Sequence, residues 1–371
     1  MHLERLWLTD FRSYRHAEFA PAPQGITVVT GANGEGKTNL LEAIGYLATL
    51  RSLRGNPSES LIRTGDGAER AVVRMEGRRE ARRIVVEAEI SATGRSRAQV
   101  NGQALRRVRD LLGALQVTVF TPEDLALVKG GPQGRRQYLD DLLVALHPRH
   151  DATIAEVERV LKQRTALLKS AGWQAAAGRG LAPDVESTLE VWDAKLAAAG
   201  DALARARAGL AEALGLRAAD AYRRVASGVA HRGRDVVSLH YETSWQGSLA
   251  EALRAARGED LRRGVSTVGP HRDDLRLQIG STPARTHASQ GEQRSLALAL
   301  RLAGHHLVAE RIGSEPVLLL DDIFSELDAS RAEALLACLP SGQAIITTAG
   351  HLPVEAVVAA WARIEDGKLL A

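Results

Sequence analysis

Cysteine is nearly absent from this sequence. Cys338 is the only one in 371 residues, so a disulfide within the chain and a metal site built from several cysteines are both excluded. Such sparing use of cysteine is typical of a reducing compartment. We therefore expect a cytoplasmic protein.

Long apolar segments are also missing. No apolar run approaches the roughly 18–20 residues that span a bilayer, and the stretch MHLERLWLTDF lacks the basic and then apolar pattern of a secretion signal. We therefore expect no membrane association. The remaining composition, 45% hydrophobic and 25% charged, is that of an ordinary globular protein with room for two domains.

Lysine is scarce as well. Only six of the 48 basic residues are lysine, and the net charge is +3 with a pI of about 9.2, a weak indication of nucleic-acid binding. Between Arg51 and Arg109 there are 14 arginines and 7 acidic residues. This excess suits a surface that contacts phosphates as well as it suits an ordinary solvated face.

Strand-like and helix-like patterns occupy different parts of the chain. β-branched or alternating runs occur at 3–14, 26–30, 71–76, 83–90 and 117–120, and return in VVSLHYE, DDLRLQIG, PVLLLDD and QAIITTA. From about 135 to 260, apolar residues mostly recur three and four apart, as in helices. This order predicts an α/β fold in which 1–115 and 265–371 form one lobe and a mainly helical lobe, 116–264, is inserted.

A glycine-rich loop follows the strand at 26–30 and fits G-x-x-x-x-G-K-[ST], the phosphate-binding P-loop pattern. Glycine allows positive φ and has no Cβ, so backbone N–H groups can converge on phosphate oxygens beside a helix N-terminus. Lys37 supplies positive charge to the β- and γ-phosphates, and the Thr38 hydroxyl is a ligand for Mg²⁺. The absence of an Asn-Lys-x-Asp element favours ATP over GTP. The predicted nucleotide-binding residues are Gly31, Ala32, Asn33, Gly34, Glu35, Gly36, Lys37, Thr38 and Asn39.

Two aspartates end another buried strand, PVLLLDD at 316–322. A carboxylate at the end of a strand beside the P-loop can hold Mg²⁺, and we assign this role to Asp321. The next acid, Asp322, is placed to orient or deprotonate an attacking water. Lys37 and Asp322 are therefore the predicted catalytic residues, with ATP and Mg²⁺ as cofactors.

A third motif, Ser289-Gln290-Gly291-Glu292-Gln293, begins a helical run far along the chain from the P-loop. A small hydroxyl residue and a glycine at a helix start form an anion site, although an ordinary N-cap has the same residues. Because the P-loop lysine already has its own helix, Ser289 and Gly291 are predicted to contact a nucleotide in another copy of the chain. The motif resembles the ATP-binding-cassette signature, and Ser325-Glu326-Leu327-Asp328 resembles the D-loop of such ATPases.

Four segments together resemble the RecF family of bacterial DNA repair proteins, nearly from end to end. They are LTDFRSY, the segment between Pro122 and Asp140, VGPHRDDL from Val268, and LLLDDIFSELDASRAEAL. The resemblance implies a P-loop ATPase of the ATP-binding-cassette type, related to SMC and Rad50 heads but without their long coiled coil. It also implies a homodimer that forms on ATP binding, binds double-stranded DNA or a single-strand/double-strand junction, and works with RecR and RecO to load recombinase at gaps.

The chain departs from the wider cassette pattern in several places. Asp322 stands where glutamate is usual, which moves the carboxylate roughly 1–1.5 Å from a water placed for glutamate and can cost about 10²-fold in rate. We therefore predict a weak ATPase that acts as a switch. Glu123 replaces an expected glutamine and is a candidate Mg²⁺ ligand. His351 lies too far along the chain for the usual γ-phosphate histidine, and Thr347 or Thr348 is the candidate replacement.

Arg12 lies in the FRSY segment, an edge that is near the nucleotide in related heads. A phosphate or adenine contact is therefore predicted for Arg12, and a structural arginine at a strand end fits the sequence equally well.

Two other classes of function remain open at this stage. An ATPase subunit of a membrane transporter would have its two motifs closer together, and co-purification with a membrane partner would support it. A small-molecule P-loop kinase would need an acceptor pocket and no signature motif, and rapid phosphorylation of a small substrate would support it.

Overall fold

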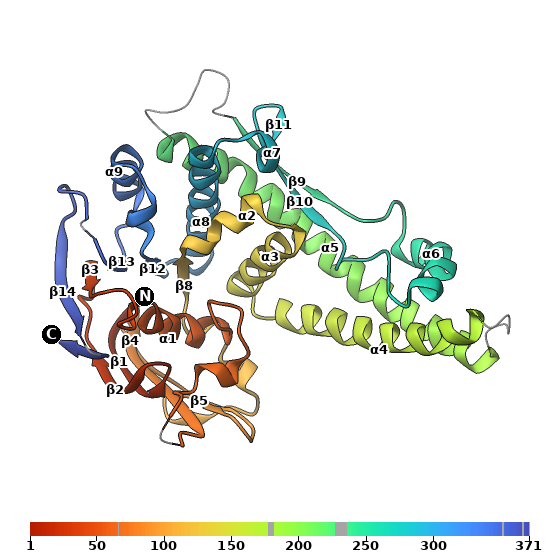
Figure 1. The fold of residues 1–371 in the computed structure, drawn as a ribbon, viewed down its shortest axis with the longest axis horizontal. Coiled ribbons are helices and arrows are strands. Elements are labelled where there is room, and N and C mark those ends of the chain that lie inside the picture. Colours follow the sequence, from red (N-terminus) through yellow and green to blue (C-terminus); the bar gives the residue numbers. More distant parts are fainter. Residues whose placement is uncertain (66, 177–181, 227–235, 351, 366, 371) are drawn as a thin grey trace. The chain divides into compact units, whose positions relative to one another are not determined.

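The computed structural model describes residues 1–371 apart from 66, 177–181, 227–235, 351, 366 and 371 (Figure 1). The chain divides into two compact units. Unit 1 comprises Met1–Leu125, Arg217–Asp235 and Ser289–Ala371, and unit 2 comprises Ala126–Leu216 and Val236–Ala288. Both ends of the chain thus belong to one unit, and the second unit is inserted between them in sequence.

Unit 1 contains a six-stranded, mostly parallel sheet in the order β15-β14-β3-β13-β12-β8. β15 is antiparallel to β14, and the other neighbours are parallel. Every residue of β12 and β13 is buried, as expected for strands at the centre of a parallel sheet. The strands are β3 (Gly25–Thr30), β8 (Val117–Phe120), β12 (Val317–Asp321), β13 (Gln343–Thr348), β14 (Val358–Glu365) and β15 (Lys368–Leu370).

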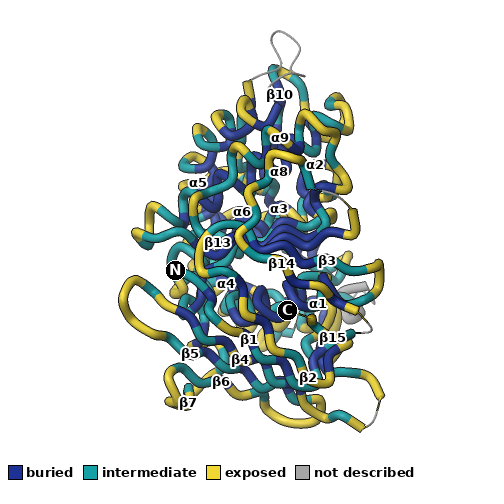
Figure 2. Tube along the Cα trace, turned by 90° about the vertical axis from the view of Figure 1, so that its left-hand side faces the viewer, coloured by how far each residue is buried: buried dark blue, intermediate teal, exposed yellow. Residues whose placement is uncertain are grey.

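A second six-stranded sheet in unit 1 is antiparallel, in the order β2-β1-β4-β5-β6-β7. Helix α1 (Lys37–Thr49) contacts strands of both sheets, and Leu40, Ile44 and Leu47 on it are fully buried. The buried segments are dark blue in Figure 2. The strands of this sheet are β1 (His2–Phe11), β2 (Tyr14–Phe19), β4 (Arg70–Arg79), β5 (Arg82–Ser91), β6 (Arg97–Val100) and β7 (Gln103–Ala104).

The predicted strand at 3–14 is interrupted in the structure. β1 ends at Phe11, and β2 begins at Tyr14 after a turn in which Arg12 has a positive φ of 51°. The turn folds the two strands against each other, with Phe11 opposite Tyr14.

The antiparallel sheet places several of the arginines between Arg51 and Arg109 in ion pairs, and of the paired glutamates only Glu4 lies outside the seven acidic residues already counted there. Glutamates on neighbouring strands pair with several of these arginines, in the combinations Arg70–Glu89, Arg74–Glu87, Arg78–Glu4 and Arg83–Glu76. Cross-strand pairs of this kind neutralise charge on the sheet surface. The face therefore offers less free positive charge than the count of arginines suggests.

Unit 2 is mainly helical and includes a three-stranded antiparallel sheet in the order β11-β10-β9. Arg164 of α4 is fully buried and donates hydrogen bonds to Asp193 of α5 at 2.7 Å and to Asp260 of α6 at 2.6 Å. These ion pairs tie three helices together. The elements are α3 (Pro132–Leu146), α4 (His150–Ala176), α5 (Pro183–Val225, in unit 2 up to Leu216), β9 (Val237–Glu242), α6 (Leu249–Arg263), β10 (Asp274–Ile279), β11 (Thr282–Pro283) and α7 (Ala284–His287). The short α2 (Leu125–Lys129) contains the sequence boundary between the units, since unit 1 has a segment that ends at Leu125 and unit 2 begins at Ala126.

The bounds of the two units differ from those of the predicted lobes. The stretch 116–125 falls in unit 1, because β8 pairs with β12 in the parallel sheet. The stretch 265–288 falls in unit 2, because β10 pairs with β9. Ser289 begins the last segment of unit 1, which also holds α8 (Gln290–Ile312) and α9 (Ala329–Cys338).

Across the described ranges, no helix combines the length and the apolar character that crossing a membrane requires.

Candidate nucleotide-binding site

The loop between β3 and α1 has the backbone of an anion cradle. Gly34 and Gly36 have φ of 90° and 107°, in the left-handed region that favours glycine. Gly36 is the N-cap of α1 and, having no side chain, makes no side-chain cap hydrogen bond to the first turn. A Cβ on Gly31 would lie 2.7 Å from the carbonyl oxygen of Ile364. The loop therefore requires these glycines and leaves the start of α1 able to bind an anion.

Lys37 is folded back over this loop. Its side chain is 7% exposed, and its Nζ donates to the carbonyl oxygens of Gly31 at 2.8 Å and Ala32 at 2.9 Å. The ammonium group thus sits inside the cradle, where phosphate oxygens would compete with two neutral carbonyls for it.

Three side chains meet at the ends of α1, β12 and β13. Asp321 accepts hydrogen bonds from Thr38 Oγ1 at 3.0 Å and Thr347 Oγ1 at 2.6 Å. Burial raises the pKa of Asp321 above its usual value; these two hydrogen bonds oppose the rise, and the nearby charges of Glu123 and Asp322 add to it. A divalent cation fits this group of oxygens, because it would stabilise the ionised carboxylate that burial disfavours. Two of the three predicted metal-site residues, Thr38 and Asp321, are thus in contact, while Glu123 influences the pKa of Asp321 through its charge and stays a predicted ligand.

Asp322 is held in an unusual conformation beside them. Its φ is 48°, and its backbone N–H donates to the carbonyl and hydroxyl oxygens of Thr347, each at 3.1 Å. Its Oδ1 is buried and has no hydrogen-bond partner in the described part of the chain. A buried carboxylate oxygen without a donor fits the predicted role, because a water or ligand hydroxyl would satisfy it. Of the two threonines proposed to replace the histidine, Thr347 is the one that contacts the aspartates, and His351 lies outside the described residues.

Ser289 caps the N-terminus of α8. Its Oγ accepts a hydrogen bond from the Glu292 backbone at 3.2 Å, and the Glu292 carboxylate accepts one from the Ser289 N–H at 2.7 Å, which completes a capping box. Gly291, in the first turn of α8, lies against the side chain of Arg331. The geometry gives Ser289 an ordinary structural role and leaves its predicted nucleotide contact as a prediction.

Arg12 makes contacts that the sequence did not indicate. Its guanidinium binds both carboxylate oxygens of Glu42, at 2.7 and 3.0 Å, and donates to the Ser60 carbonyl at 2.9 Å. Burial would raise the pKa of Glu42, but hydrogen bonds from Arg12 and Ser52 hold it below its usual value. Glu42 was missed by sequence reasoning, although an acidic residue inside the apolar pattern of α1 was a usable signal.

The remaining P-loop residues have mixed surroundings. Ala32, Asn33 and Gly34 are exposed. Glu35 accepts a hydrogen bond from the Gly367 N–H at 3.2 Å, and the amide of Asn39 donates to Ser13 Oγ at 2.9 Å. Tyr14 stabilises the end of the loop, because its hydroxyl donates a hydrogen bond to the Gly36 carbonyl at 2.9 Å.

Comparison with known proteins shows which family the chain resembles. Residues 2–360 match the RecF/RecN/SMC N terminal domain. The DNA replication and repair protein RecF of Streptomyces avermitilis is 44% identical over 359 residues, which cover 94% of this chain and 93% of that protein. RecF of Frankia alni is 45% identical over 373 residues, covering 96% and 95% of the two chains.

Solved structures agree. A structure described as the recombination mediator protein RecF-ATP in the RecFOR pathway has a TM-score of 0.87 and 28% identity, and the match covers 100% of this chain and 98% of that one. The Smc head domain of Pyrococcus furiosus, bound to the C-terminal domain of ScpA, has a TM-score of 0.54 and 17% identity, with coverage of 100% and 96%. This second likeness concerns the fold alone, and it confirms the predicted SMC-like head.

Proposed function

The chain belongs to the RecF family of DNA replication and repair proteins, and we propose that it is an ATP-gated homodimer that binds DNA during recombinational repair. The observation that carries this proposal is the arrangement of the P-loop, Lys37, Thr38 and Asp321 within unit 1. It supports binding of ATP with Mg²⁺, and a RecF relative has been solved with ATP. Because the proposed partner is DNA, we also propose a cytoplasmic location.

In the proposed site, the chain's own groups divide the work. The loop N–H groups and Lys37 bind the triphosphate, and Thr38 and Asp321, together with the candidate ligand Glu123, would hold Mg²⁺, which would neutralise charge on the phosphates. Asp322 orients a water through its unpartnered Oδ1. Because aspartate is shorter than the usual glutamate, hydrolysis is slow, and we expect DNA to stimulate it.

The second half of each site comes from a second copy. Ser289 and Gly291 at the start of α8 close on the γ-phosphate held by the partner, so two nucleotides join a symmetric dimer. Hydrolysis removes the γ-phosphate and releases the two copies. ATP thereby shifts a monomer–dimer equilibrium instead of driving continuous movement.

DNA binding is proposed to act mainly through phosphates, without base readout. The solved RecF relative is assigned to the RecFOR pathway, and by the same relationship we propose RecR and RecO as partners that help load recombinase at gaps. Duplex DNA and single-strand/double-strand junctions are the candidate substrates.

Light scattering of the full chain with ATP, with ADP and without nucleotide, each with and without a short duplex, tests this function. We expect the dimer mass with ATP and Mg²⁺ only, and DNA affinity that falls steeply as salt rises. A protein that stays monomeric at high concentration with saturating ATP, Mg²⁺ and DNA would refute the proposal.

A further inference from the structure

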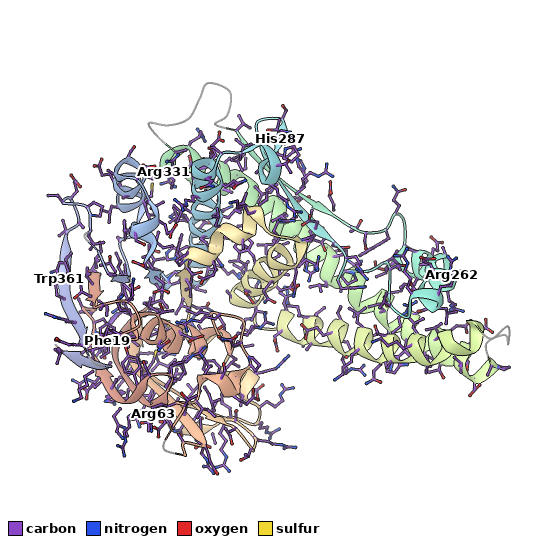
Figure 3. The ribbon with its side chains drawn as sticks, viewed as in Figure 1. Phe19, Arg63, Arg262, His287, Arg331 and Trp361 are labelled. Carbon is purple, nitrogen blue, oxygen red and sulfur yellow. The ribbon has the colours of Figure 1, made fainter. Side chains whose placement is uncertain are left out.

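Two arginines join the start of α8 to the segment that follows β12, both within unit 1. Arg331, labelled in Figure 3, lies on α9. It donates from Nε to the Ser295 hydroxyl at 3.2 Å, and its Nη1 is paired with Asp328. Only 12% of the Arg331 side chain is exposed. Arg294, on α8, donates to the backbone carbonyl and to the carboxylate of Glu326. The segment Ser325–Asp328 is therefore tied to α8 at two points.

Gly291 is the residue of α8 that leaves room for Arg331. A Cβ on residue 291 would lie 2.8 Å from Cζ of Arg331, closer than such atoms normally approach. Gly291 has an ordinary helical backbone conformation within α8. Glycine is needed here because it has no side chain, not because of its backbone freedom. Because Asp328 and Ser295 hold the guanidinium, an alanine at 291 would have to displace it from both.

Asp328 fixes the other end of this link. It caps α9 by accepting a hydrogen bond from the Arg331 N–H at 2.9 Å. This backbone hydrogen bond and the Arg331 guanidinium hold the pKa of Asp328 below its usual value, so the pair is ionised at neutral pH. Asp322 is the N-cap of the short helix Ile323–Glu326, which leads toward Asp328, so the link ends only a few residues from the Asp322 carboxylate.

We propose that Arg331 is a positioning residue that makes the start of α8 and the loop leading from Asp322 move as one body. The inference rests on the proposed function, in which Gly291 faces the triphosphate of the partner copy while Asp322 serves the chain's own nucleotide. A change at one site of the dimer is then transmitted to the other site through Arg331.

The test compares three variants of the full chain: Arg331→Ala, Arg331→Lys and Arg223→Ala. Arg223 is the matched control, because it pairs with Asp220 at the same three-residue spacing in unit 1. We expect Arg331→Ala to bind ATP as the wild type does, while its ATP-dependent dimerisation constant weakens about tenfold to a hundredfold, the range for losing a hydrogen-bonded charge. Arg331→Lys should recover only part of the lost dimerisation affinity, because an ammonium group lacks the planar shape with which the guanidinium reaches both Asp328 and Ser295. Arg223→Ala matches the wild type.

Amide hydrogen exchange of the nucleotide-free monomer gives a second readout. Arg331→Ala should accelerate exchange at both 289–296 and 323–328. Gly291→Ala should do the same, and the double variant should exchange no faster than either single variant, because both changes remove the same link. A merely structural loss would instead raise exchange throughout unit 1.

The outcomes separate the inference from the function it rests on. Additive exchange effects, or equal dimerisation of Arg331→Ala and Arg223→Ala, would overturn the role of Arg331 while leaving the ATP-gated dimer intact. Failure of the wild type to dimerise with ATP would remove the proposed function itself.

Discussion

Replacing Arg12 decides between the two roles that its position allows. The Glu42 side chain is fully buried, and its carboxylate receives two charged hydrogen bonds from Arg12 and one from Ser52 at 2.5 Å. Arg12→Met keeps most of the apolar stem and removes the charge. The change leaves the buried Glu42 carboxylate without its cationic partner, and losing one partner of a buried ion pair costs about 3–5 kcal/mol of folding stability.

The expected loss lies at the lower end of that range. Ser52 still donates to Glu42, and the carboxyl can take up a proton once the guanidinium is gone, so its pKa should rise. Removing both charges in Arg12→Met/Glu42→Gln should recover most of the stability, because no buried charge is left alone. Arg63 is the control: it pairs with Asp10 at 2.8 Å, and because the Asp10 side chain is 27% exposed while that of Glu42 is fully buried, water can solvate Asp10 after Arg63→Met, which should therefore cost less stability than Arg12→Met.

Urea unfolding and titration with a fluorescent ATP analogue measure the two quantities separately. We expect Arg12→Met to lose stability and, where folded, to bind nucleotide within about threefold of the wild type, a difference under 1 kcal/mol. Unchanged stability together with a tenfold or greater loss of nucleotide affinity would show that the guanidinium serves the nucleotide, and that the scaffold role inferred from Glu42 is mistaken.

Three further predictions address the nucleotide site. Lys37→Met should abolish ATP binding, since the loop loses its only buried ammonium; unchanged affinity in the same titration would contradict the site. Asp322→Asn should bind ATP normally and accumulate as the ATP-bound dimer on a sizing column, because the unpartnered Oδ1 no longer acts as a base; a monomer under these conditions would count against its role. Ser289→Arg should leave each monomer able to bind ATP while blocking dimerisation in light scattering, and a dimer of normal strength would show that the start of α8 does not face the partner.

The P-loop and its flanking elements were predictable because the information is local. Glycines at 34 and 36, a β-branched run before them and an apolar helical pattern after them all lie within about 25 residues, a span over which periodicity and turn chemistry are readable. The structure has β3, the loop and α1 in that order. Asp321 was also predictable, because the carboxyl ends of parallel strands meet at one edge of the sheet.

The pairing of distant segments was not predictable in the same way. β1 pairs with β4, and β8 pairs with β12, across separations that no local pattern records. For that reason 116–125 was expected in the helical lobe, although β8 within it is the edge strand of the parallel sheet. The arginines of β4 and β5 illustrate the same limit, since their charge could be counted from the sequence while their cross-strand glutamates could not be matched.

His271 in unit 2 makes stability depend on pH in a direction that the structure fixes. Its Nε2 lies 3.0 Å from the Ser266 carbonyl, an acceptor only, so Nε2 carries the proton and Nδ1 is bare. Nδ1 is buried and, in the described part of the chain, has no partner. Burial lowers the pKa of His271 from 6.5 to about 4; the Ser266 bond opposes this shift, and the positive charges of Arg272, Arg136 and Arg164 reinforce it.

Because the folded state disfavours protonated His271, the unfolded state takes up the proton first. The contribution of neutral His271 to the free energy of unfolding is fully present above pH 6.5. It is lost as pH falls toward 4, by about 3 kcal/mol in total. His271→Gln keeps an N–H donor for the Ser266 carbonyl and cannot titrate, so its unfolding free energy should fall less steeply over this interval. Urea unfolding of both full-length proteins at pH 7.5, 6 and 4.5 measures the difference between their unfolding free energies. The titration of carboxylates affects both proteins equally and does not contribute to this difference. Parallel pH profiles for the two proteins would mean that Nδ1 finds an acceptor for its proton in the folded chain, and that the imidazole is not held neutral by burial.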